Sequence, residues 1–199
     1  MKIETLTTFE QVKNIVDSLK KNLNRNHTLD IDKVLDVVIK DLQEKFGLKN
    51  INIFLLDKPR EKLLPYRLFN PQLSQSVVDK LYQLPIILAN EPGMLLYIFE
   101  KKISIYIPEM KPEMVLSPWG KEVFEITGMQ GNLMFPLVIE EMVCGLITFP
   151  SFDIPLNLTK KQIEAIANYI FYISIALTSM FYSIELQEKN KIIQEKNRQ

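Results

Sequence analysis

The sequence predicts an α+β fold in which long helices flank a central region of strands. Apolar residues recur every three or four positions near both ends of the chain, which is the spacing of a helix buried along one side. The middle of the chain instead contains short β-branched and aromatic runs of the kind found in strands. Two long apolar runs, 131–139 and 142–149, are joined at Glu140-Glu141 and predict a well-covered central hairpin.

The composition limits both the size class and the chemistry of the chain. Its 199 residues fit one compact domain with extensions, and 47% of them are hydrophobic, which is enough to build a core. Because 24 basic residues balance 24 acidic ones, the sequence carries no electrostatic footprint for nucleic acid. One cysteine, Cys144, and one histidine, His27, exclude a disulfide framework and a multi-cysteine metal site. We therefore expect no nucleic-acid partner and no metal, and we identify no cofactor.

A helix is predicted at the N-terminal end of the chain, where Thr7 and Glu10 are spaced as a capping box. Its apolar residues follow alternating steps of three and four, which is the a/d spacing of a coiled coil. They are Phe9, Val12, Val16, Leu19 and Leu23. This seam predicts packing either on its own domain or on the same helix of a second copy.

The next part of the chain alternates helices and strands. A second helix is predicted from about 30 to 46, ended by Gly47. Strands are then predicted at 50–56, 63–69, 86–88 and 103–107, and helices at 74–84, from about 91, and at 119–126. Residues 111–118 are rich in proline and methionine and are predicted to form a loop.

The last predicted helix begins at a second capping box, formed by Thr159 and Gln162. Residues 165–184 carry no charge and are long enough to cross a bilayer. Their polar residues and their helical period instead favour a helix buried on two sides, by its own domain and by a partner. The small, weakly polar side that suits a partner helix includes Ala176, Ser179 and Ser183.

These patterns divide the chain into three parts. We expect a dimerisation helix over 1–27, a folded domain over 28–184, and the start of a helical linker to an output domain over 185–199. The first ten residues contain acidic side chains and lack the apolar region of a secretory signal. A cytoplasmic location without membrane contact is therefore expected.

Three segments in serial order resemble one known family. They are GMLLYIFEKKISIYIP at 93–108, GNLMFPLVIEEMVCGLITF at 131–149, with its Pro136-Leu137 and Gly145-Leu146 steps, and LTKKQIEAIANYI at 158–170. The first is similar to a helix and third strand of a GAF domain, the second to its strand pair, and the third to its last helix. The chain thus resembles a GAF domain over about 30–184.

The resemblance implies a GAF-like (profilin/PAS-like) antiparallel sheet with helices on both faces. It also implies a small-molecule pocket between the sheet and the short middle helices, and a dimer bundle of the first and last helices that passes a signal along the chain. The chain departs from the phosphodiesterase members that bind cyclic nucleotides, because no acidic pair follows Lys121 and Phe124. It also lacks the cysteine with a nearby histidine of bilin-binding members and the several cysteines of methionine-sulfoxide-reducing members.

Aromatic and thioether side chains concentrate near the implied pocket, where they favour either an apolar or planar ligand or an ordinary core with gap-filling methionines. The candidate pocket residues are Arg67, Tyr106, Met110, Met114, Trp119, Phe124, Met129 and Met134. Arg67 would anchor an anion if it pointed inward. Cys144 lies in an apolar strand and is predicted to be a core residue, and Glu140-Glu141 a simple turn.

Three functions remain open from the sequence. The first is a dimeric, non-catalytic sensor domain of a signal-transduction protein that binds a small molecule or a partner and biases an output domain. The second is a dimerisation scaffold with a filled core and no ligand. The third is an enzyme with redox chemistry at Cys144. The sequence favours the first, because two helical seams flank a domain that lacks familiar catalytic residues.

Overall fold

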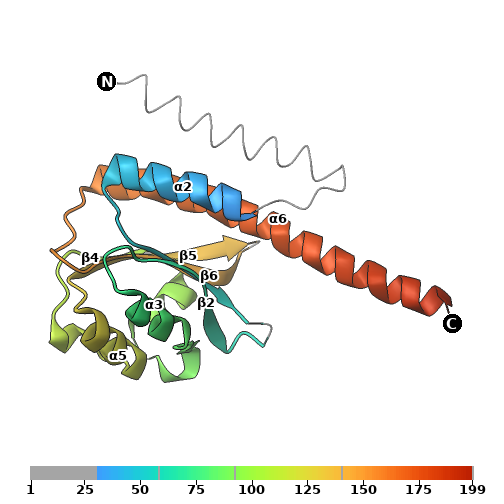
Figure 1. Ribbon diagram of the computed structural model, residues 1–199, viewed down its shortest axis with the longest axis horizontal. Helices are drawn as coiled ribbons and strands as arrows, with labels where there is room; N and C mark the ends of the chain where they lie inside the picture. Colours follow the sequence, from blue (N-terminus) through green and yellow to red (C-terminus); the bar gives the residue numbers. More distant parts are fainter. Residues whose placement is uncertain (1–30, 58, 92, 140, 199) are drawn as a thin grey trace, which may run out of the picture. The chain divides into compact units, whose positions relative to one another are not determined.

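The computed structural model describes residues 31–57, 59–91, 93–139 and 141–198 (Figure 1). The predicted seam from Phe9 to Leu23 lies outside the described residues, as do the side chains of Ala176, Ser179 and Ser183. The elements are α2 (Ile31–Phe46), β1 (Ile51–Leu56), β2 (Lys62–Phe69), α3 (Gln75–Tyr82), β3 (Ile86–Ile87), η2 (Leu88–Asn90), α4 (Met94–Lys101), β4 (Ile105–Ile107), η3 (Pro112–Met114), α5 (Pro118–Thr127), β5 (Gly131–Ile139), β6 (Met142–Ser151) and α6 (Lys160–Arg198).

The strands form one antiparallel sheet of six, in the order β3-β2-β1-β6-β5-β4. The predicted hairpin is confirmed, since β5 and β6 pair from Gly131–Ser151 to Ile139–Met142. Strand β6 also pairs with β1, and Gly145 permits their close approach because a Cβ there would overlap the carbonyl oxygen of Phe54. The α+β class and the antiparallel sheet predicted from the sequence are therefore confirmed.

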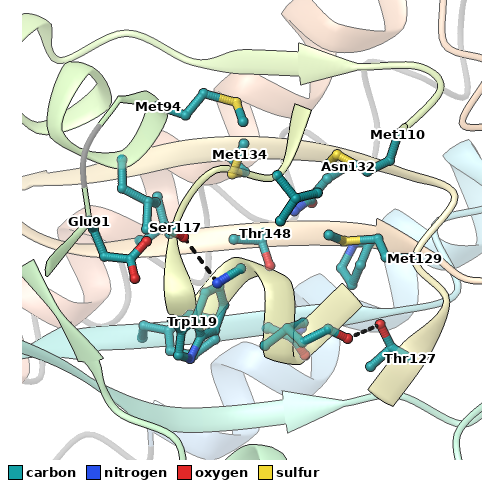
Figure 2. Close-up of a pocket in the computed structure, with 18 of the residues that line it drawn as sticks. Glu91, Met94, Met110, Ser117, Trp119, Thr127, Met129, Asn132, Met134 and Thr148 are labelled. Carbon is teal, nitrogen blue, oxygen red and sulfur yellow. Dashed lines mark hydrogen bonds between the residues drawn. The ribbon is translucent and has the colours of Figure 1, made fainter. Parts of the chain in front are cut away.

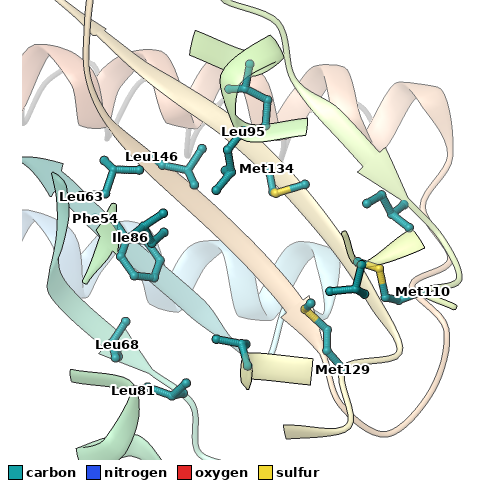
Figure 3. Close-up of a cluster of buried hydrophobic side chains, with 14 residues drawn as sticks. Phe54, Leu63, Leu68, Leu81, Ile86, Leu95, Met110, Met129, Met134 and Leu146 are labelled. Carbon is teal, nitrogen blue, oxygen red and sulfur yellow. The ribbon is translucent and has the colours of Figure 1, made fainter. Parts of the chain in front are cut away.

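Strand alternation gives the sheet two buried faces. One face contributes Phe54, Leu63, Met134 and Leu146 to a core cluster that also contains residues of α3, α4 and α5 (Figure 3). The other face contributes Ile53, Leu133, Phe135, Ile147 and Phe149, all at most 5% exposed. The sheet therefore forms a middle layer whose first face carries the short helices.

The chain divides into two compact units. The larger unit runs from Leu42 to Ile170 and contains the sheet, the short helices, the end of α2 and the start of α6. In it, Lys45 Nζ donates a 3.0 Å hydrogen bond to the Tyr169 hydroxyl, and the rings of Phe46 and Tyr169 meet edge to face at 6.0 Å. These contacts join the end of α2 to the start of α6.

The smaller unit contains, among the described residues, 31–41 of α2 and 171–198 of α6. Leu35 and Leu177 are fully buried in this unit, as the helical periods predict. No helix in the described part of the chain is long and apolar enough to cross a membrane.

Local signals in the sequence position several element ends. Gln162 N donates to Thr159 Oγ1 at 3.3 Å, and Thr159 N donates to Gln162 Oε1 at 2.9 Å, so the predicted capping box at the start of α6 is confirmed. Ser117 caps α5, and Gly128 ends it with a φ of 63°. The predicted strand 103–107 is shorter, because Lys102 caps α4 in the left-handed conformation and β4 begins at Ile105.

Candidate ligand-binding cavity

A cavity of about 210 Å³ lies between the first face of the sheet and the short helices (Figure 2). Leu81 of α3, Leu95 of α4 and Val123 of α5 contribute to its wall. Each is less than 9% exposed, so the same side chains that attach the helices to the sheet also enclose the cavity. The volume is well above the ~10–15 Å³ that one ordered water molecule needs. It suits a compact organic molecule.

Methionines and one tryptophan contribute adaptable and aromatic surface to the remaining wall. Five methionines line the cavity: Met94, Met110, Met114, Met129 and Met134. The indole of Trp119 is fixed twice, by an edge-to-face contact with Phe54 at 6.1 Å and by a 3.0 Å hydrogen bond from its Nε1 to the carbonyl oxygen of Leu84. A fixed aromatic face combined with adaptable thioethers suits the body of an apolar or planar ligand.

A row of polar side chains crosses the floor of the cavity. Asn52 of β1 is the cross-strand partner of Thr148 of β6, and Thr148 is diagonal to Asn132 of β5. All three are at most 8% exposed and line the cavity. Asn52 Oδ1 accepts a 2.8 Å hydrogen bond from Nδ2 of Asn70, which continues the row onto the end of β2. Polar groups therefore replace apolar ones along one line of an otherwise apolar sheet face.

Asn70 and Asn132 of this row each have a buried Oδ1 without a hydrogen-bond partner among the described residues, and of the two only Asn132 lines the cavity. Its Oδ1 atom is buried and accepts no hydrogen bond within the described part of the chain. An unpaired buried polar group costs about 1–3 kcal/mol, and such groups are rare in folded proteins. The cavity is thus lined by an amide that the protein itself leaves unsatisfied.

Glu91 introduces a carboxylate at the start of α5. The residue is 4% exposed, and its side chain lies near the Ser117 hydroxyl and the backbone N–H of Trp119. Burial raises the pKa of Glu91, and the neighbouring Ser117 hydroxyl and Trp119 N–H reduce the increase. Ser117 precedes Pro118 and accepts a 3.0 Å hydrogen bond from Gly120 N, which is the local pattern of a helix start.

The structure brings together five of the eight residues that the sequence proposed for the pocket. Met110, Met114, Trp119, Met129 and Met134 line the cavity. The other three, Arg67, Tyr106 and Phe124, do not. Phe124 packs against the core cluster of the same layer without reaching the cavity.

Arg67 and Tyr106 belong to the opposite face of the sheet. Arg67 is the strand partner of Ile53, so it is not placed to anchor an anion in the cavity. Tyr106 pairs with Leu133, and its hydroxyl bonds the loop before α6. In both cases the strand register, rather than residue type, decides the face.

Sequence reasoning missed the polar residues of the cavity. Asn52, Asn132 and Thr148 are each a polar residue in an apolar strand, at positions that alternate with buried aliphatic ones. That interruption is a signal visible in the sequence. Glu91 and Ser117 lie in loops, and only the tertiary structure brings them together.

Cys144 lies on β6 outside the cavity lining. Its Sγ donates to the carbonyl oxygen of Leu137 at 3.2 Å. Burial raises the pKa of Cys144 to about 11, and the positive charge of Arg60 opposes this only weakly. The thiol therefore stays protonated at neutral pH, which makes it a poor nucleophile.

Among the described residues, no three His, Cys, Asp or Glu side chains cluster in a way that could hold a metal ion.

Solved structures share this architecture. A GAF domain/HD domain protein from Geobacter sulfurreducens matches with a TM-score of 0.64 and 17% identity, over 77% of this chain and 95% of that one. The GAF domain of an Acinetobacter phosphoenolpyruvate-protein phosphotransferase matches at 0.60 and 11% identity, over 94% and 99%. The chain has the fold of a GAF domain. A phycocyanobilin-bound GAF domain from a cyanobacterial phytochrome also matches, at 0.63 and 10% identity, over 88% and 96%.

The GAF fold agrees with the resemblance that the sequence suggested, at identities too low to carry function across. No protein-family model and no curated protein matches the chain. No family pattern therefore assigns functional roles to residues of this chain, and those roles are inferred from the geometry of the cavity.

The state of Cys144 gives a first prediction. Because burial keeps the thiol neutral, we expect the folded protein to react with a thiol reagent such as DTNB at pH 7.5 at least about tenfold more slowly than the same chain unfolded in guanidinium chloride. The reaction of the folded protein should accelerate as the pH rises toward 11. Rapid stoichiometric labelling at pH 7.5 would contradict this and would revive a redox role.

Proposed function

We propose that this chain is a non-catalytic sensor domain of a signal-transduction protein, and that it binds a compact small molecule in the cavity on the first face of the sheet. The observation that carries the proposal is the buried Asn132, with its unpaired Oδ1, in the wall of a cavity that is lined mostly by apolar side chains. A ligand that supplies a hydrogen-bond donor would satisfy this amide and recover the free energy that its burial costs.

The alternative of a ligand-free scaffold fits the same residues less well. A domain that served only as a scaffold would gain stability from an apolar side chain at position 132 and from a filled space beside it. Instead, the chain keeps a cavity of about 210 Å³ and a buried polar row beneath it. Both features reduce the stability of the empty domain, and both become favourable when a ligand is bound.

The solved structures of similar fold support a signalling role. They include a segment of a methyl-accepting chemotaxis protein and a domain of a putative two-component sensor histidine kinase. Among the described residues, the cavity lining has one carboxylate, Glu91, which lies near the helix-capping Ser117, and Cys144 lies outside the lining. This arrangement favours binding over catalysis.

The larger unit provides a route from the cavity to the start of α6. Phe152 lines the cavity and begins the loop that leads to Lys160. That loop is tied back to β4, because Leu156 N donates to the carbonyl oxygen of Pro108 at 2.7 Å and Leu158 N donates to the Tyr106 hydroxyl at 2.8 Å. We propose that a ligand displacing Phe152 moves this loop and with it the first turns of α6.

We further propose that α6 and the N-terminal helix pair with those of a second, cytoplasmic copy and pass the displacement to an output domain. The support is the sequence pattern: the seam from Phe9 to Leu23 and the small side at Ala176, Ser179 and Ser183. Two identical helices with such surfaces can pack closely without a buried charge.

Occupancy of the cavity is tested by thermal unfolding with a panel of metabolites. A ligand at 100 times its Kd stabilises the folded state by about 2.7 kcal/mol, which raises the Tm of a chain of this length by about 5–10 °C. Val123→Phe places a larger ring in the cavity and should abolish the shift, because Val123 is buried and lines it.

Val37→Phe provides the matched control, since Val37 is 47% exposed on α2, and it should leave the shift unchanged. If Val123→Phe retained the full shift, or if no compound and no co-purifying small molecule bound, the scaffold function would replace the sensor function.

The dimer is tested by sedimentation velocity on the full chain and on a chain lacking 1–27 and 185–199. We expect the full chain to sediment as a dimer and the shortened chain to dissociate at least about tenfold more readily, because it loses the N-terminal seam. A monomer in both cases would contradict the proposed relay.

A further inference from the structure

The polar groups of the cavity indicate what kind of molecule it binds. We propose that the ligand is a compact nitrogen base, with an apolar body and a basic amine or amidine whose N–H groups bond Glu91. This inference rests on the proposed function, since it requires that the cavity binds a small molecule at all.

Glu91 is the one charged side chain among the described residues that line the cavity. It forms no ion pair with any described residue. The groups that act on its carboxylate are the Ser117 hydroxyl and the Trp119 backbone N–H, which are both neutral, and a carboxylate can accept about four hydrogen bonds. A buried carboxylate without a cation is costly, whereas one with a hydrogen-bonded cation is stable. A protonated nitrogen of the ligand would donate hydrogen bonds to the vacant acceptor positions of Glu91. It would also provide the positive charge that this carboxylate lacks.

A purely structural role explains Glu91 less completely. Accepting the N–H groups at the start of α5 requires only a neutral oxygen, and Ser117 already accepts one of them from Gly120. A glutamine would provide such an oxygen without burying a charge. The carboxylate is therefore more than the helix start needs, and its place in the cavity wall is where a cationic ligand would meet it (Figure 2).

The wall beside Glu91 also favours a cation. The backbone N–H of Trp119 lies near this carboxylate, and Trp119 lines the same cavity. An aromatic face attracts a positive charge, most strongly where water is excluded. Anionic ligands are disfavoured by the same carboxylate, because no lining residue in the described part of the chain carries a compensating positive charge.

Asn132 supplies a second acceptor. Its unpaired Oδ1 belongs to a residue of the floor strand β5. In the view of Figure 2, the labelled Thr148 lies between Glu91 and Asn132. Both Glu91 and the Oδ1 atom of Asn132 can therefore accept a hydrogen bond from a donor group of a ligand. A small heteroaromatic amine, with a ring N–H for Asn132 and an ammonium group for Glu91, would meet both.

The test compares molecules of equal shape and different charge. Isothermal titration of the full chain should show tryptamine binding at least about tenfold more tightly than its alcohol analogue tryptophol, since a hydrogen bond to a charged group contributes more than a neutral one. Indole-3-acetate should bind more weakly than either. Benzamidine and benzamide form a second pair of similar shape. The cationic benzamidine should bind more tightly than the neutral benzamide.

The variant Glu91→Gln should reduce the preference for tryptamine over tryptophol to less than about threefold, because it removes the charge but retains an acceptor. Glu122→Gln, an exposed change on α5, removes the same charge and should leave the preference intact.

Equal binding of tryptamine and tryptophol to the wild-type protein overturns the nitrogen-base inference while leaving the sensor function in place. If none of the four compounds binds, the nitrogen-base inference is overturned. The sensor function is tested separately by the metabolite panel and would be removed only if that panel also failed. The comparison on wild-type protein does not depend on the folding of any variant.

Discussion

The central constraint on this molecule is that the alternation of side chains along the strands places a row of polar residues in the wall of a buried cavity and not on the solvent-exposed surface. In a sheet covered on both faces, every inward position is normally apolar, because a buried polar group without a partner destabilises the fold. Asn52, Thr148 and Asn132 break that rule on three neighbouring strands. The cavity, the proposed ligand and the proposed sensor role all depend on that departure.

The remaining features of the site follow from how the short helices meet the sheet. Helix α5 begins at Ser117-Pro118, and its first turn brings Trp119 near Glu91. The helix therefore contributes an aromatic wall close to a carboxylate that comes from the loop before α4. The loop after β6 passes from Phe152 in the cavity to the capping box of α6. One short segment thus connects the cavity, which is the proposed binding site, to α6, which is the proposed output.

Much of the fold could be predicted from the sequence because its signals are local. The central hairpin, the capping box at Thr159 and the stop of α5 at Gly128 each depend on a few adjacent residues. The thioether and aromatic wall was also found in part, because Met110, Met114 and Trp119 are close together in the chain. Local composition was enough for these features.

The other part of the site depends on register, which the sequence does not show. Between Ile53 and Phe54 of β1 the pairing with β2 shifts, so that Tyr66 is an extra residue and Arg67 changes face. Without that bulge, Arg67 would share the face of Leu63, which belongs to the core cluster on the cavity side. The polar row likewise becomes visible only when β1, β6 and β5 are aligned.

The most direct measurement is the free energy of unfolding of the ligand-free variant Asn132→Leu. If the amide is kept for a ligand and not for the fold, the variant should be more stable than the wild type by about 1–2 kcal/mol, because an unpaired buried oxygen is removed. Asn50→Leu is the contrasting control. Asn50 has an unpaired buried Oδ1 as well, but its Nδ2 donates to Gln72 and to the carbonyl oxygen of Pro150, and the loss of these two hydrogen bonds should destabilise the protein. A loss of stability in Asn132→Leu as large as that in Asn50→Leu would contradict the account.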